Sequence, residues 1–200
     1  MKKHNHVLIG IVIGILMLVA CPAWAGYEEG ENAYLRGDFQ TALEVWRPLA
    51  EEGNAEAQNM LGYMYRFGEG VDSNFELARK WYRLAADKGN PTAQNNLGVM
   101  YRLGLGGDQD FQEALYWFRR AADQGNGGAQ NHLGLMYYKG EGVAPDKVHA
   151  YKWAYLAAQQ GLDPAIQAVG MLEQELTPEQ IEEAKTMARE WKPRGEEVAL

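Results

Sequence analysis

The chain has 200 residues, a net charge of −8 and a single cysteine. An acidic balance is unfavourable for binding the phosphates of nucleic acids, so the composition argues against a nucleic-acid partner. One cysteine cannot form an internal disulfide, so a buried core must hold the fold, and this length is sufficient for one.

Residues 1–25 have the features of a secretory signal peptide: a basic start, an apolar run and a small-residue cleavage site. The apolar run over residues 7–20 is too short to span a bilayer comfortably, since about 20 residues are needed. Ala23 and Ala25 supply the small residues that a signal peptidase requires. We therefore expect a mature protein that begins at Gly26 and is periplasmic or secreted. Retention of the segment as a membrane anchor is the alternative.

A second processing route involves Cys21, because Leu18-Val19-Ala20-Cys21 resembles the lipobox of bacterial lipoproteins, in which the cysteine is acylated. Pro22 directly after the cysteine, and a conventional cleavage site four residues later, favour the soluble product. Cleavage after Ala25 leaves 17 basic and 27 acidic residues and no cysteine. The mature protein would then contact a membrane only if Cys21 were lipidated or the signal retained.

Three stretches of similar sequence follow one another without a gap, each 36 residues long: Ala57–Thr92, Ala93–Gly128 and Ala129–Pro164. They share a Leu-Gly pair, a tyrosine, two glycines, a tryptophan and an Ala-Ala pair in register. A period of this length is typical of stacked supersecondary units. Because a two-helix unit cannot bury its apolar face alone, neighbouring units must stack into one continuous core.

Each unit is expected to contain two helices. In the first helix Ala57, Leu61 and Tyr65 share one face, and Gly62 beside them allows close approach of a neighbouring helix. Gly68 and its partner Gly70 end that helix. The second helices begin at residues with good N-capping side chains, namely Asn74, Asp110 and Asp146. The predicted buried face of the first of these helices runs through Phe75, Ala78, Trp81 or Tyr82, and Ala85.

The chain ends are atypical. Residues 26–56 hold a shortened capping unit whose loop is five residues shorter by alignment. Residues 165–192 are expected to form C-terminal capping helices, and residues 193–200 a tail. The last helix opens with a capping box at Thr177-Pro178-Glu179-Gln180 and is predicted to seal the last repeat.

The repeated pattern, A-x-x-x-L-G-x-M-Y-x-x-G-x-G-V followed by A-x-x-W-(Y/F)-x-x-A-A-x-x-G, resembles that of the Sel-one-like repeat family, relatives of tetratricopeptide repeats. The departures are Gly107 for valine, Lys147 in place of phenylalanine, and Ala154 for the second aromatic residue. The resemblance implies an all-α, right-handed α-solenoid of stacked helix-turn-helix units. It also implies a scaffold or adaptor for other proteins, which in secreted bacterial members serves envelope-associated or host-facing interactions.

Some secreted members of this family have been described as β-lactamases or penicillin binders, which makes catalysis the main alternative. A serine enzyme of that kind needs S-x-x-K. Ser73 is the only serine, and Glu76 stands where the lysine should be. The two histidines after the signal, His132 and His149, fall in different predicted helices and do not suggest a zinc site. We therefore predict no catalytic residue, metal or cofactor, and keep a β-lactamase-like protein or a binder of cell-wall fragments as the alternative.

The expected partner is a protein or peptide on the concave surface, which the first helices line in solenoids of this type. One stripe of residues recurs there beside the packed face: Asn59, Tyr63 and Arg66, then Asn95, Val99 and Arg102, then Asn131, Leu135 and Tyr138. Asparagine suits a peptide backbone and arginine a carboxylate. Gln94 is expected to be exposed. The alternative is that the A-Q-N motif recurs only because the repeats were duplicated.

Overall fold

The computed structural model describes residues 22–193, with the backbone alone for residues 22–25. Within that part the chain forms ten helices and no strand. Their bounds are α1 Pro22–Leu35, α2 Phe39–Glu51, α3 Ala55–Phe67, α4 Phe75–Asp87, α5 Pro91–Leu103, α6 Phe111–Ala122, α7 Gly127–Lys139, α8 Lys147–Gln159, α9 Asp163–Leu172 and α10 Pro178–Glu190. Cys21 lies outside the described residues. Ala23 and Ala25 fall in the backbone-only start of α1, so the predicted cleavage site stays a prediction.

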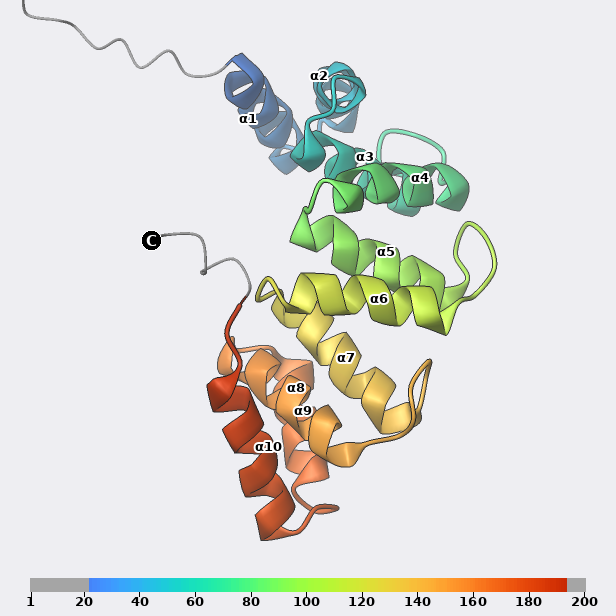
Figure 1. The fold of residues 1–200 in the computed structure, drawn as a ribbon. Helices are drawn as coiled ribbons and strands as arrows, with labels where there is room; N and C mark the ends of the chain where they lie inside the picture. Colours follow the sequence, from blue (N-terminus) through green and yellow to red (C-terminus); the bar gives the residue numbers. More distant parts are fainter. Residues whose placement is uncertain (1–21, 194–200) are drawn as a thin grey trace, which may run out of the picture.

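The helices stack in one column from α1 to α10 (Figure 1). From α1 to α8 each helix packs against the helices that directly precede and follow it in the sequence, whereas α9 packs against α8. The predicted all-α repeat solenoid is therefore confirmed. None of the described helices is long and apolar enough to cross a membrane.

The predicted helix ends are confirmed in all three units. The Asn74, Asp110 and Asp146 side chains accept hydrogen bonds from backbone N–H groups in the first turn of α4, α6 and α8. Such N–H groups have no partner inside the helix, which is why an acceptor here stabilises it. Glycines in the left-handed conformation end the first helices at Gly68, Gly104 and Gly140.

The glycine beside the packed face permits a close aromatic contact, as the sequence predicted. A β-carbon placed on Gly62 would lie 2.6 Å from the ring of Tyr82, and one on Gly98 would lie 2.7 Å from the ring of Phe118. Each ring comes from the second helix of the same unit, so the first and second helices of a unit meet at this point. Tyr82 and Phe118 are fully buried there.

Two details of the predicted units were wrong. The connection of α1 to α2 spans three residues, 36–38, against seven in each full repeat, so the loop is four residues shorter rather than five. Phe75 is 41% exposed and Trp81 is half-buried, so the core position is Tyr82. The loop of the next unit packs on the Phe75 backbone, where a β-carbon on Gly106 would contact the Phe75 carbonyl.

The C-terminal helices depart from the repeat geometry. Thr177 and Gln180 form the predicted capping box of α10. Ala184 and Ala188 are buried, and Trp191 meets Trp153 of α8 edge to face with ring centroids 6.0 Å apart. Because α10 packs against α8 rather than α9, α9 has no second helix of its own, and Ile166 and Met171 on it are half-exposed.

Candidate partner-binding face

The predicted stripe lies on α3, α5 and α7, and all its members are partly exposed. We call it the first-helix stripe: Asn59, Tyr63, Arg66, Asn95, Val99, Arg102, Asn131, Leu135 and Tyr138. Adjacent units touch along it, because the Asn96 side chain donates to Asn59 Oδ1 at 3.2 Å. The stripe therefore meets the neighbouring unit directly between α3 and α5.

At the end of the stripe, Arg102 and Tyr138 are already held by acidic residues of the following segment. Arg102 makes a two-point contact with Glu141, Nε to Oε2 at 2.6 Å and Nη2 to Oε1 at 3.3 Å, and both side chains are less than one-fifth exposed. The Tyr138 hydroxyl donates to Glu175 at 3.0 Å, which raises the pKa of Tyr138, and Lys147 binds the same carboxylate. Arg102 as an anchor for a partner stays a prediction, and its guanidinium is already paired with Glu141 within the chain.

Arg66 differs from Arg102 because the register places Leu105 where Arg102 finds Glu141. In the part of the chain that the structure describes, Arg66 has no ion pair. Its guanidinium lies 4.9 Å from the ring centroid of Phe67, which in turn contacts Tyr63 at 4.5 Å. Burial raises the pKa of the Tyr82 hydroxyl, and the Arg66 charge beside that hydroxyl opposes the shift.

The glutamine of the A-Q-N motif is structural. Gln58, Gln94 and Gln130 are buried, and each donates to a carbonyl of the preceding second helix, of Ala50, Ala86 or Ala122, at 2.8–3.5 Å. Each of these carbonyls also accepts a backbone N–H of the following turn, from Gly53, Gly89 or Gly125, so the glutamine adds a second hydrogen bond that ties the next first helix to the end of the preceding helix. Gln124 also donates to Gln94 Oε1 at 2.8 Å. The expectation that Gln94 is exposed was wrong, and only the asparagine of the motif reaches the stripe.

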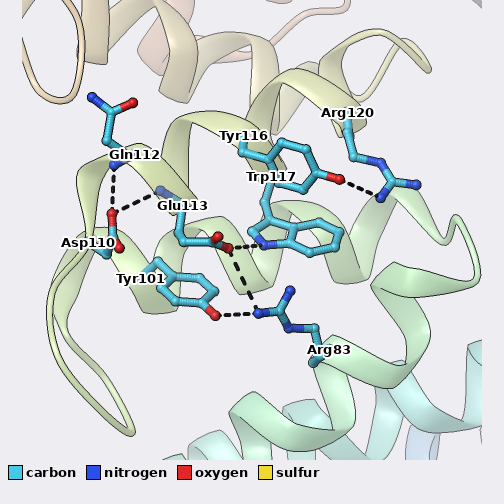
Figure 2. A network of polar contacts seen from close by, with 8 residues as sticks. All are labelled: Arg83, Tyr101, Asp110, Gln112, Glu113, Tyr116, Trp117 and Arg120. Carbon is cyan, nitrogen blue, oxygen red and sulfur yellow. Dashed lines mark hydrogen bonds and ion pairs between the residues drawn. The ribbon is translucent and has the colours of Figure 1, made fainter.

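An arginine–tyrosine ladder, which the sequence reasoning missed, joins the units through the second helices. Arg47, Arg83 and Arg119 each donate to the tyrosine 18 residues later, Tyr65, Tyr101 or Tyr137. Figure 2 shows the middle rung, where Arg83 also faces Glu113 and Glu113 accepts from the Trp117 indole at 3.0 Å. The signal was present, since both residue types recur every 36 positions. These arginines are engaged within the fold.

Both histidines have structural contacts. His132 is stacked on Phe118 with ring centroids 4.7 Å apart, and burial lowers its pKa to about 4, with Arg102 and Arg66 adding to the effect. His149 contacts Asp146 at 2.7 Å. Across residues 22–193 no group of three or more histidine, cysteine or carboxylate side chains is placed to hold a metal ion.

A pocket of about 220 Å³ opens between α7, α8 and α9. Three small residues, Gly134, Ala154 and Ala168, line it together with Ala150 and Pro164, and Leu135, Met171 and Leu172 contribute larger apolar side chains. The stripe residues Asn131 and Tyr138 also line it. The other predicted partner-binding residues, on α3 and α5, are not part of this pocket.

The two-helix units stack on one another, and in the first two units an aromatic ring packs on a glycine of the first helix. This architecture is that of a helical-repeat solenoid. A family model for the Sel1 repeat matches residues 55–90, 91–126 and 128–162, which is more than half of the chain. The chain belongs to the Sel1 repeat family, whose members are generally protein-interaction scaffolds and typically not enzymes.

Solved structures agree with this assignment. The Sel1 repeat protein from Oxalobacter formigenes is 29% identical, with a TM-score of 0.71 over 82% of this chain and 68% of the other. A protective antigen of uropathogenic Escherichia coli strains, described as displaying an SLR fold, is also 29% identical, with a TM-score of 0.60. That match covers 84% of this chain but only 45% of the antigen. The comparison with curated proteins found no match.

Proposed function

We propose that this protein is an exported, non-enzymatic scaffold that binds an extended segment of a partner protein along the first-helix stripe, on the concave side. The observation that carries the proposal is Arg66, a cation without an acidic partner in the described chain. At the equivalent position Arg102 is neutralised by Glu141. The family's general role in protein interaction supports the same reading.

The stripe offers a partner two kinds of contact. The Arg66 guanidinium can bind a carboxylate with two parallel hydrogen bonds, a geometry that Lys cannot reproduce. Beside it Phe67 is 52% exposed and presents an apolar surface next to Tyr63. The partner segment that fits is therefore one that carries an acidic side chain or a terminal carboxylate close to an apolar residue.

Export is part of the proposal and is supported by the signal-like segment that ends at Ala25. Cleavage there would leave the anchoring contacts of α1 in place. The Trp46 indole donates to the Tyr27 carbonyl at 3.1 Å, and Gly30 packs against the same indole. Acylation at Cys21 would instead place the same scaffold on a membrane.

The scaffold is favoured over a binder of cell-wall fragments because of the lining of the α7–α8–α9 pocket. Apart from Asn131 and the hydroxyl of Tyr138, every lining side chain is apolar or absent. Sugar hydroxyls and the carboxylate of a β-lactam need several polar partners when they are buried. A hydrolysis assay with β-lactams is therefore expected to give no turnover, and measurable turnover would overturn the non-enzymatic assignment.

The binding proposal is tested by cross-linking the tagged protein in its own cells, identifying the captured chain and measuring its affinity for two variants. Arg66→Ala and Lys80→Ala remove the same charge, from the stripe and from the exposed side of α4 respectively. We expect Arg66→Ala to weaken binding and Lys80→Ala to leave it unchanged, with wild-type binding reduced by added salt. The opposite ranking of the two variants would place the recognition surface on the second helices.

A further inference from the structure

In the first two units an aromatic ring of the second helix fills the space between two consecutive first helices. The Tyr82 ring lies on Gly62, and the Phe118 ring lies on Gly98. On its other side the Phe118 ring stacks against His132 of the next first helix, 27° from parallel. The repeat geometry therefore contains a slot for one ring in each unit.

The third unit keeps the slot but lacks the ring. Counting 36 residues on from Gly98, Phe118 and His132 gives Gly134, Ala154 and Ala168. All three line the pocket of about 220 Å³ between α7, α8 and α9. The pocket therefore lies at the positions that a phenylalanine and a histidine occupy one unit earlier. On its Gly134 side the α8 backbone comes closer, since a β-carbon there would lie 3.1 Å from the Ala150 carbonyl oxygen and 3.2 Å from the Ala154 nitrogen, and the space that remains is lined by α9.

We propose that this pocket binds an aromatic side chain of the partner protein, a proposal that rests on the scaffold function and specifies it. An apolar cavity of about 150 Å³ is large enough to bind benzene, so the available space suits a phenylalanine or tyrosine ring. The ring would lie against Ala154 and Ala168, the positions that Phe118 and His132 hold one unit earlier. Met171 is 54% exposed at the pocket and has the flexible thioether that adapts to an aromatic surface.

The polar groups of the pocket indicate that the ring belongs to a polypeptide. The side chain of Asn131 makes no hydrogen bond within the described residues. Its amide group therefore offers both a donor and an acceptor to the backbone of a partner. It belongs to the same stripe as Arg66, two units away, so one extended segment can reach both. The carboxylates of Glu173 and Glu175 on the turn after α9 disfavour anionic lipid as the occupant.

The first test uses p-cresol, the side chain of tyrosine, titrated into the mature protein while the methionine methyl signals are followed by NMR. We expect the Met171 signal to shift with saturation. The Ala154→Phe variant places a phenylalanine where the second unit has Phe118. Its affinity for p-cresol should fall by at least about tenfold, because the new ring occupies the apolar space. Leu103→Phe adds a ring at a position that is 52% exposed and should leave the affinity unchanged. If Ala154→Phe does not fold, Ala168→His is the second blocking variant.

The second test measures the affinity of the captured partner for Ala154→Phe, which we expect to fall while Leu103→Phe binds normally. The inference is overturned if p-cresol does not perturb Met171, or if the partner binds Ala154→Phe as tightly as the parent. It is also overturned if the parent is a dimer in solution and Ala154→Phe is a monomer, since the occupant would then be a second copy. Loss of binding in Ala154→Phe but not in Arg66→Ala would refute the arginine anchor and retain the pocket.

Discussion

Gly98→Ala tests whether the rings seated on glycine determine the stability of the solenoid. The new methyl group would lie 2.7 Å from two carbons of the Phe118 ring, much closer than ordinary contact. Phe118 cannot retreat, because it is fully buried and its other face is stacked on His132. Overpacking of this kind costs about 1–3 kcal/mol.

The methyl group also brings a gain, since alanine is a better helix former than glycine by about 0.5–1 kcal/mol. We therefore expect Gly98→Ala to lower the free energy of unfolding by about 1–2 kcal/mol after this offset. Gly170→Ala is the matched control, because a β-carbon there meets nothing within 4 Å. Gly170→Ala gains the same helix propensity without a clash against a neighbouring side chain, so it should stabilise the protein by about 0.5–1 kcal/mol.

Thermal unfolding of the two variants provides the measurement. For a chain of this size about 1 kcal/mol corresponds to about 2–4 °C in Tm, so the two alanines should shift Tm in opposite directions by a resolvable amount. The Gly98→Ala penalty should also vanish in a Phe118→Ala background, where the ring is absent. Equal shifts for Gly98→Ala and Gly170→Ala would refute the reasoning, and so would a penalty that persists without the ring.

Four further outcomes are expected. The low pKa of His132, about 4 against 6.5 unfolded, means that the unfolded chain binds more protons between these values, so stability should fall as pH drops through that window. The loss is about 2 kcal/mol at pH 5, and His132→Asn should remove it from denaturant unfolding curves measured at pH 7 and 5. Gln94→Ala should lower the free energy of unfolding by about 1–3 kcal/mol, because the fully buried amide makes two hydrogen bonds, to the Ala86 carbonyl and from Gln124, and both are lost; urea unfolding would detect this. Leu105→Glu should pair with Arg66 and weaken capture of an acidic partner in the same binding assay, with a lower Tm because the partly buried Leu105 packs against the core. The intact mass of exported protein should match a chain that begins at Gly26, and a diacylated or triacylated cysteine start would contradict this.

The helix boundaries could be predicted because their causes are local. An asparagine or aspartate cap acts on N–H groups two or three residues away, as Asn74 does, and a glycine such as Gly68 supplies a left-handed residue at its own position. The 36-residue register then carried each local assignment from one unit to the next. Even so, the pattern placed Phe75 in the core, although its side chain is 41% exposed.

The partners of the stripe could not be predicted in the same way, because they come from another unit. Arg102 meets a carboxylate 39 residues later, and Gln94 meets a carbonyl in the preceding helix. A helical periodicity says which side of its own helix a residue occupies, and not what the next helix brings to that side. The position of α10 could not be predicted for the same reason. Its stripe of alanines indicates that it packs against another helix, but does not indicate that this helix is α8.

The positions at which this repeat departs from its own pattern are therefore the most informative about binding. A residue that is the same in all three units, such as the glycine at 62, 98 and 134, is accounted for by stacking, which every unit must satisfy. Leu105 and Ala154 also pack within the fold, but each differs from the residue at the same position of a neighbouring unit. The first leaves a guanidinium without the acid that the next unit has, and the second leaves a slot without the ring that the previous units have. Both positions lie beside the first helices. A carboxylate next to Arg66 would repeat the Arg102–Glu141 pair, and an aromatic ring in the pocket would repeat the position of Phe118. A partner that supplies a carboxylate and an aromatic ring would thus complete the repeat pattern from outside.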